Sequence, residues 1–284
     1  MKVRIISATV GVILLIGVLF LMNTPVFSIA IAALSVIAVH EIETVAKVEN
    51  KVVRALSYVF AALTPIAIDY DLLNRFNISY FSVLTVFGLA ILISMLAQYE
   101  KTKFEHIAIS FFACVTVPFS FSILVIFRDL HEKFNCYDEK HCLYFIIFGL
   151  CSAWITDTFA YFVGSKFGKH KMTPKISPKK SIEGAVGGVV GAAVFNVLAT
   201  FIFNKFVFEG TKIPLWAVAV VSVVLSFISM FGDLSASVIK RNYGAKDFGK
   251  IMPGHGGVMD RFDSCLFTLP TLYLILYYIG RFSV

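Results

Sequence analysis

The part of the sequence best equipped for chemistry is residues 232–264, GDLSASVIKRNYGAKDFGKIMPGHGGVMDRFDS. This segment is rich in glycine and charge, although apolar runs flank it on both sides. On a helix, the spacing i, i+4, i+7 and i+8 places an acid, a hydroxyl and two cations on one face: Asp233, Ser237, Lys240 and Arg241. This combination of side chains is typical of sites that bind phosphate groups.

A glycine-rich loop follows this helix and leads to a pair of acids. Its glycines free backbone N–H groups to approach an anion closely, in the run Gly254, His255, Gly256 and Gly257. Asp260 and Asp263 then share one face at the start of the last apolar run, where a helix N-terminus also favours anions. Because carboxylates hold hard divalent cations and Lys and Arg neutralise phosphate oxygens, the segment predicts phosphoryl chemistry.

The alternative interpretation of this segment is a ring of solvated loop charges around a helix hairpin. Ionisable groups at a membrane boundary are costly and tend to be functional, which favours a site. A second polar group supports it: Asp157 lies inside an apolar run, where an isolated aspartate costs roughly 2.5–3.5 kcal/mol on insertion scales. We expect Asp157 to face a cation or a water-filled cavity, and Lys179 and Lys180 precede the next apolar run. Ordinary cytoplasmic loop charge is the alternative for those lysines.

Membrane helices must position these residues. Of the 284 residues, 58% are hydrophobic and 15% are charged, against about 25% charged in soluble domains. Runs of about 20 apolar residues suit helical crossings of a bilayer. We predict an all-α integral membrane protein, a polytopic bundle of about nine helices in one domain, 1–284, with N-terminal spans over 1–142 and a catalytic half over 143–284. The predicted spans are 5–22, 25–39, 54–68, 79–98, 106–127, 143–164, 184–204, 214–236 and 262–280.

The distribution of positive charge predicts the orientation. Most of the 25 Lys and Arg residues fall on the side of the N-terminus, so the N-terminus and the basic loops 165–183 and 241–261 are expected in the cytoplasm. The first apolar run is interpreted as a retained span, because a second run follows almost at once. The net charge of +7 fits this asymmetry and attraction to anionic lipid, and nothing indicates nucleic-acid binding.

Three other polar groups carry weaker signals. His40, Glu41 and Glu43 resemble the start of a zinc-peptidase motif, but Thr44 stands where the second His is required, so we interpret them as interfacial charges. Cys136 and Cys142 lie in an external loop, where a disulfide and free thiols are both open. His131 and His141 nearby raise a metal site as a further alternative, although the spacing matches no standard zinc pattern.

The chemical segments resemble a known family. Ser237, Lys240-Arg241, Lys246-Asp247, the run 253–257, Asp260-Arg261 and Asp263 resemble, in residue type and spacing, the signature of phosphatidate cytidylyltransferases, also called CDP-diacylglycerol synthases. The stretch from Asp157 to Gly184 is similar to a second segment of that family, with Ser181 where Thr is usual and Ile182 where an aromatic is common. The resemblance covers about residues 150–270.

The resemblance implies an integral membrane enzyme that converts phosphatidate and CTP into CDP-diacylglycerol and pyrophosphate with Mg2+, and it leaves a second metal ion open. It implies metal ligands at Asp233, Asp260 and Asp263, and phosphate contacts at Lys240, Arg241 and Lys246. Substrate contacts are implied at Ser235, Ser237, Asp247, His255, Gly256, Gly257, Arg261, Lys179, Lys180 and Asp157. For His255, phosphate binding and a lock on the glycine loop are equally open.

Two other functions compete with this one. A CTP-dependent lipid kinase of the polyprenol or phytol type would transfer the terminal phosphate instead. An ion-coupled transporter would line an ion path with Asp157 and Asp233, but its acids are expected near the midplane of paired repeats rather than at one face. Gly184, Gly187, Gly188 and Gly191 form small-xxx-small pairs, which indicate close helix packing and would also suit a homodimer contact.

Overall fold

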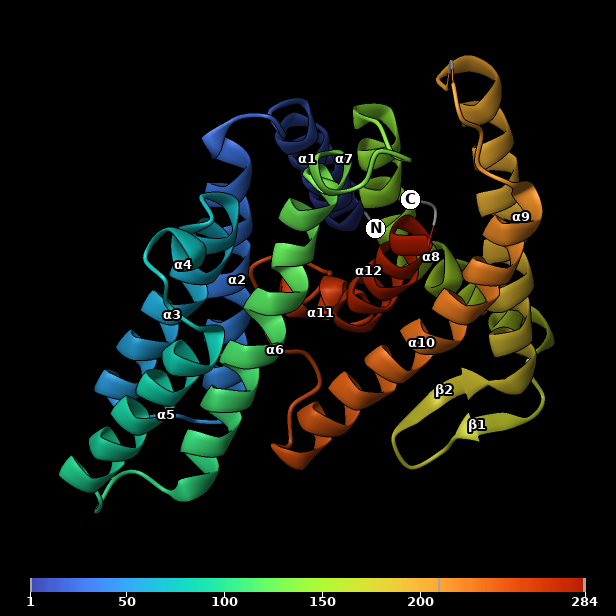
Figure 1. Ribbon diagram of the computed structural model, residues 1–284. Helices are drawn as coiled ribbons and strands as arrows, with labels where there is room; N and C mark the ends of the chain where they lie inside the picture. The colour runs from blue at the N-terminus through green and yellow to red at the C-terminus, as the bar shows by residue number, and fades with distance from the viewer. Residues whose placement is uncertain (1, 209, 283–284) are drawn as a thin grey trace. The chain divides into compact units, whose positions relative to one another are not determined.

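The computed structural model describes residues 2–208 and 210–282, with side chains from residue 6 onward, and is almost entirely helical (Figure 1). The helices are α1 (Lys2–Phe20), α2 (Pro25–Val45), α3 (Lys51–Asp69), α4 (Leu72–Arg75), α5 (Tyr80–Ala97), α6 (Phe104–Arg128), α7 (Leu130–Lys133), α8 (Glu139–Phe167), α9 (Ile182–Phe206), α10 (Leu215–Asn242), α11 (Met259–Phe262) and α12 (Cys265–Phe282). Two short antiparallel strands, β1 (Lys171–Thr173) and β2 (Ser177–Ser181), form a hairpin between α8 and α9. The predicted helical class is confirmed.

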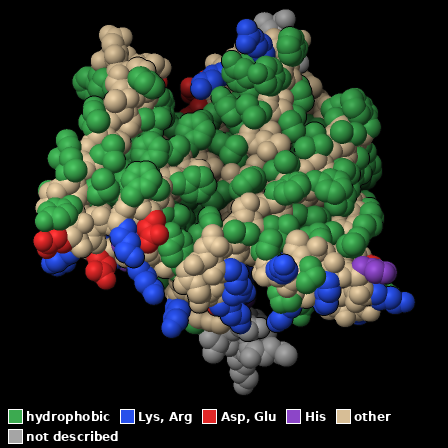
Figure 2. Space-filling view, turned by 90° about the horizontal axis from the view of Figure 1, so that it is seen from below, with side chains coloured by type: hydrophobic (Ala, Val, Ile, Leu, Met, Phe, Trp, Pro, Cys, Tyr) green, Lys and Arg blue, Asp and Glu red, His purple; other side chains and the backbone are tan. Residues whose placement is uncertain are grey.

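Eight helical segments within the described residues are long and apolar enough to cross a membrane. The last of them joins α11 and α12 over Met259–Phe282, and the described apolar part of α1, Ile6–Phe20, is shorter than the others. A polytopic membrane protein is therefore confirmed, whereas the count of nine spans is not. Large apolar side chains such as Phe81 and Leu96 on α5 are 77% and 69% exposed, which suits contact with lipid. Figure 2 shows hydrophobic side chains over most of the face that it draws.

The chain packs as two compact units, while the predicted single domain and its two halves that meet at residues 142 and 143 stay a prediction. Unit 1 contains the residues up to Ile126 together with Asn242–Phe262, and unit 2 contains Phe127–Arg241 together with the residues from Asp263 onward. The chain enters unit 1 a second time because the loop after α10 and the short helix α11 pack with the N-terminal helices. The signature segment therefore contributes to both units.

In unit 1, helix α2 packs on α3, which in turn packs on α5. Asn50 starts α3 as an N-cap, since its side-chain oxygen accepts hydrogen bonds from the backbone N–H groups of Val52 and Val53 at 2.9 and 3.2 Å. The rings of Phe60 and Phe87 stack with centroids 4.3 Å apart and join α3 to α5. Of these helices, α2 contacts the loop 243–258, since the backbone N–H of Val258 donates to Glu41 at 3.0 Å.

In unit 2, α8 and α9 make the most extensive contact between any two elements (Figure 1). Small residues allow it, since a Cβ at Gly188 would lie 2.8 Å from the Thr156 carbonyl oxygen and one at Gly184 would lie 2.8 Å from that of Ala160. The expected close helix packing is thus found inside the chain, and a homodimer contact stays a prediction.

The five cysteines are all free thiols. The Cys142 sulfur lies 3.7 Å from Nδ1 of His131, and His141 instead stacks on Phe208 with ring centroids 4.3 Å apart. Across residues 2–208 and 210–282, no three His, Cys, Asp or Glu side chains form a metal-binding group. The loop that precedes α8 is thus held by ring packing and hydrogen bonds.

Candidate active site

Three aspartates from distant parts of the sequence come together in unit 2. Asp157 lies in the middle of α8, Asp233 lies on α10, and Asp263 lies in the turn before α12, where it is 7% exposed. Asp263 experiences the negative charges of both other carboxylates. Gly232 lets α10 approach this turn, because a Cβ there would lie 2.9 Å from the Asp263 carbonyl oxygen.

Two lysines balance this negative charge. The ammonium group of Lys180, at the end of β2, forms an ion pair with the Asp233 carboxylate. Nζ of Lys240, two turns further along the same face of α10 as Asp233, lies 3.9 Å from Oδ2 of Asp263. Lys240 is 9% exposed, so its charge is buried beside that of Asp263. We call this group the acid–lysine cluster: Asp157, Lys180, Asp233, Lys240 and Asp263.

Hydroxyl groups complete the acid–lysine cluster. The Ser264 hydroxyl donates to Oδ2 of Asp157 at 3.4 Å, and its backbone N–H donates to Oδ1 of Asp263 at 2.8 Å. The Ser237 hydroxyl donates to Oδ1 of Asp233 at 3.5 Å, as the i, i+4 spacing predicts. Ser264 was not among the predicted site residues, although its place next to Asp263 was a signal. Ser235 is exposed, as are Arg241 and Lys179.

The acid–lysine cluster contains the type of donor atom that Mg2+ prefers, but it does not form a complete set of metal ligands. Carboxylate oxygens are the donors that Mg2+ prefers. In the described residues, however, no three acidic or metal-ligating side chains form a metal-binding group, and lysine ammonium groups lie at two of the carboxylates. Asp233 and Asp263 are the carboxylates of the cluster that would hold such an ion, and Mg2+ stays a prediction.

Asp260 belongs to unit 1 and has a different environment. Its Oδ2 accepts hydrogen bonds from the backbone N–H groups of Phe248 at 2.8 Å, Gly257 at 2.9 Å and Gly249 at 3.4 Å. Gly256 has a φ of +87°, and a Cβ there would lie 2.8 Å from the same oxygen. In the structure Asp260 thus holds the glycine loop in its shape. Its contact with a metal ion stays a prediction.

The other loop residues divide into exposed and anchored ones. Lys246, Asp247 and Arg261 are exposed, as residues that meet a soluble substrate must be. His255 is anchored, because its Nδ1 lies 2.7 Å from the hydroxyl of Ser7 on α1, and this hydroxyl also donates to the Pro253 carbonyl at 3.1 Å. This contact agrees with the loop-locking alternative for His255.

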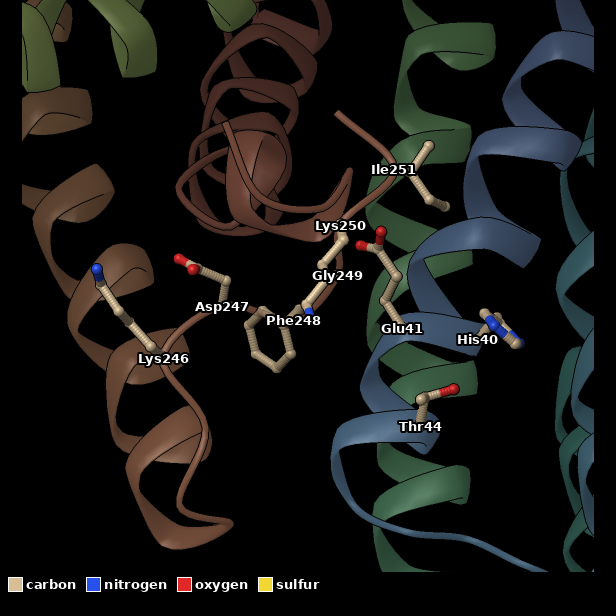
Figure 3. A pocket seen from close by; sticks show the side chains of 9 residues that line it. All are labelled: His40, Glu41, Thr44, Lys246, Asp247, Phe248, Gly249, Lys250 and Ile251. Carbon is tan, nitrogen blue, oxygen red and sulfur yellow. The ribbon is translucent and has the colours of Figure 1, made fainter. Parts of the chain in front are cut away.

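A cavity of about 440 Å³ lies between the end of α2 and this loop, within unit 1. Figure 3 shows its lining: His40, Glu41 and Thr44 from α2, and residues 246–251 from the loop. Sequence reasoning assigned His40, Glu41 and Glu43 to the membrane interface. For the two acids this was wrong, since Glu41 is 2% exposed and Glu43 is 0% exposed.

Comparison with known proteins decides the family. Residues 2–279 match the model of a family described as "Cytidylyltransferase family". The chain belongs to this cytidylyltransferase family. The resemblance seen in the signature residues is therefore confirmed, as is the prediction of a nucleotidyltransferase.

Curated relatives of this cytidylyltransferase carry a more specific name. A phosphatidate cytidylyltransferase of Bacillus subtilis (strain 168) is 30% identical over 282 residues, which cover 97% of each chain. One from Staphylococcus haemolyticus (strain JCSC1435) is 30% identical over 240 residues, 76% of this chain and 88% of the relative. Another, from Staphylococcus saprophyticus, is 37% identical over 134 residues, 47% of this chain and 49% of the relative. The similarity thus extends beyond the signature into the N-terminal helices.

Proposed function

We propose that this cytidylyltransferase transfers the cytidylyl group of CTP to phosphatidate, giving CDP-diacylglycerol and pyrophosphate. Family membership and the full-length relative named phosphatidate cytidylyltransferase support the reaction. The reaction belongs to phospholipid biosynthesis, and its lipid substrate suits a protein made of membrane helices.

The acid–lysine cluster is the observation that carries this proposal. Opposite charges on two helices, a turn and a hairpin are gathered in or beside the candidate membrane-spanning segments, although burial of charge is costly there. A helix bundle needs no such cluster for its stability, because apolar residues would pack at lower cost. Binding of a highly charged substrate explains why the charges are kept.

The chemistry requires little proton transfer. An anionic phosphate oxygen of phosphatidate attacks the α-phosphorus of CTP, a new P–O bond forms there, and the bond from the α-phosphorus to the bridging oxygen breaks. Negative charge then builds on the leaving pyrophosphate. Lys180 and Lys240, which pair with Asp233 and Asp263, would neutralise phosphate oxygens in this step, so we expect positioning and charge compensation to supply most of the catalysis.

Asp233 and Asp263 would hold Mg2+, with Asp157 and its Ser264 hydrogen bond beside them. When bound, this ion would stabilise negative charge on the triphosphate. The aspartates have a second role without the metal: through ion pairs they hold the lysine ammonium groups in place.

A labelling experiment with purified protein tests the proposed reaction. CTP labelled in the cytosine ring should transfer its label to the lipid, and pyrophosphate should be released only when phosphatidate is present. Transfer of the terminal phosphate to lipid without cytidine would identify a lipid kinase instead. Uptake of substrate by proteoliposomes without either transfer would identify a transporter.

The orientation in the membrane is part of the proposal. The basic loops 165–183 and 241–261 face the cytoplasm of a cell inner membrane or its equivalent, where CTP is present, and the N-terminus lies on the same side. Single cysteines introduced at Lys171 and Lys250 should react with an impermeant reagent only after the cells are opened. Reaction in intact cells would contradict this orientation.

A further inference from the structure

Glu41 has an unusual environment for an acid in an apolar helix. It lies near the end of α2 and is 2% exposed. Its two oxygens accept hydrogen bonds from successive backbone N–H groups, those of Val258 at 3.0 Å and Met259 at 2.8 Å. A buried carboxylate is costly without such partners. These two hydrogen bonds therefore hold the loop against α2 at Glu41.

The loop approaches Glu41 too closely for any side chain. A Cβ built at Gly249 or at Gly257 would overlap the Glu41 carboxylate. Figure 3 shows the Glu41 side chain extending from α2 toward the loop, beside Gly249 and Lys250. The contact thus requires an acid at position 41 and glycine at two positions of the loop 243–258, which we call the signature loop.

Asp260 holds the same loop by the same kind of bond. Its Oδ2 accepts from the backbone N–H groups of Phe248, Gly249 and Gly257, which precede the two that Glu41 binds. The backbone of 248–259 is therefore held by two carboxylates, one from α11 inside the signature and one from α2, more than two hundred residues earlier in the chain. Glu41 is thus one of the contacts by which the N-terminal helices hold this loop, in addition to that of Ser7.

We propose that Glu41 is a positioning residue for CTP: it fixes the signature loop in the shape in which Lys246 meets the nucleotide. The inference rests on the proposed function, which makes CTP the substrate. Glu41 acts through the backbone of the loop and does not touch the reacting atoms. Its loss should therefore affect the nucleotide more than the lipid.

The direct test is Glu41→Gln, which keeps the volume but places an NH2 group against a backbone N–H. Losing hydrogen bonds to a charged group should lower kcat/KM for CTP roughly 10- to 100-fold, mainly through KM, with KM for phosphatidate within about twofold. Glu49→Gln is the matched control, since the same change falls on an exposed acid between α2 and α3. The control should keep wild-type kinetics.

Gly249→Ala perturbs the same contact from the loop side, and it keeps the test valid should Glu41→Gln fold poorly. Its methyl group would displace the Glu41 carboxylate. We expect the same rise in KM for CTP, and a double variant little worse than the worse single one, because both remove one interaction. Hydrogen exchange measured by mass spectrometry should show faster exchange over 248–259 in both variants.

The role of Glu41 and the proposed cytidylyl transfer are tested by different outcomes. Kinetics and exchange in Glu41→Gln equal to those of Glu49→Gln would overturn the inference, as would equal increases in KM for both substrates. Absence of cytidine transfer by the wild-type protein would overturn the proposed function. In that case hydrogen exchange over 248–259 still shows whether Glu41 holds the loop, since this measurement needs no activity.

Discussion

In unit 2 the acid–lysine cluster pairs two carboxylates with lysine side chains, whereas in unit 1 two carboxylates accept hydrogen bonds from the backbone N–H groups of residues 248–259. Asp233 and Asp263 meet the ammonium groups of Lys180 and Lys240. Glu41 and Asp260 accept five hydrogen bonds from backbone N–H groups of residues 248–259. A lysine side chain can swing from a carboxylate to a phosphate without disturbing the chain, but a loop that loses its carboxylate loses its shape. The comparison therefore separates groups suited to chemistry from groups suited to holding the loop.

The largest effect is expected from Asp263→Asn in the acid–lysine cluster. Removing this charge leaves the buried Lys240 without its carboxylate, and activity should fall by roughly 10²–10³, comparable to loss of a key electrostatic group in other enzymes. Phosphatidate-dependent pyrophosphate release measures it. Asp71→Asn, at an exposed αL position that Asn tolerates, should stay active. Wild-type turnover and unchanged magnesium dependence in Asp263→Asn would remove this residue from the site.

Asp260→Asn should also lower activity, but by another route and by less, roughly 10- to 100-fold, because it weakens the three hydrogen bonds of the loop. Hydrogen exchange over 248–259 should become faster, while the magnesium concentration for half-maximal activity stays close to that of the wild type. If Asp260→Asn instead changes the magnesium requirement as Asp263→Asn does, Asp260 is a metal ligand and the contrast between the two units fails.

A smaller effect is expected from Lys180→Met, which removes the ion-pair partner of Asp233. KM for CTP should rise about tenfold, the scale of one hydrogen bond to a charged group, and exchange over 248–259 should not change. Lys175→Met is the matched control, because Lys175 is an exposed residue of the same hairpin. Equal kinetics in the two variants would show that Lys180 is an ordinary loop charge.

The smallest effect tests a carboxylate–backbone bond of unit 2 that lies outside the acid–lysine cluster. Asp138 caps α8 by accepting from the His141 N–H at 2.8 Å, so Asp138→Ala should cost about 1 kcal/mol of stability and leave turnover unchanged. Asp138→Asn should keep the cap and lose only the charge interaction with His141. Altered turnover in Asp138→Ala would show that the catalytic site is sensitive to any loss of stability.

The pH dependence of this cap has a definite sign. Burial opposes ionisation of Asp138, but hydrogen bonds from His141 and its charge outweigh it and lower the pKa of Asp138 below its ordinary value of 3.8. A lowered pKa stabilises the fold above the ordinary value, and this contribution is lost as pH falls through the lowered pKa. The difference in unfolding temperature between wild type and Asp138→Ala should therefore be full at neutral pH and shrink in strong acid.

The sequence alone determined the membrane class and the family. Runs of about 20 apolar residues are long enough to cross a bilayer wherever they pack, so composition decided the class. The signature residues could be recognised because their spacing is local: Ser237 reaches Asp233 through a single turn of α10. The i, i+3 spacing of Asp260 and Asp263 was equally visible, but it predicted one shared face for two residues that the structure assigns to different units.

Only the tertiary structure decided which partners the acids have. Asp157 and Ser264 are separated by 107 positions, and Glu41 and Met259 by 218, so no local period relates them. A carboxylate bound to a backbone N–H also leaves no trace in the sequence of its partner, because every residue except proline carries that group. For this reason Glu41 looked like an interfacial charge in the sequence. In the structure the signature loop packs on α2, and Glu41 accepts hydrogen bonds from the backbone that follows this loop's glycines.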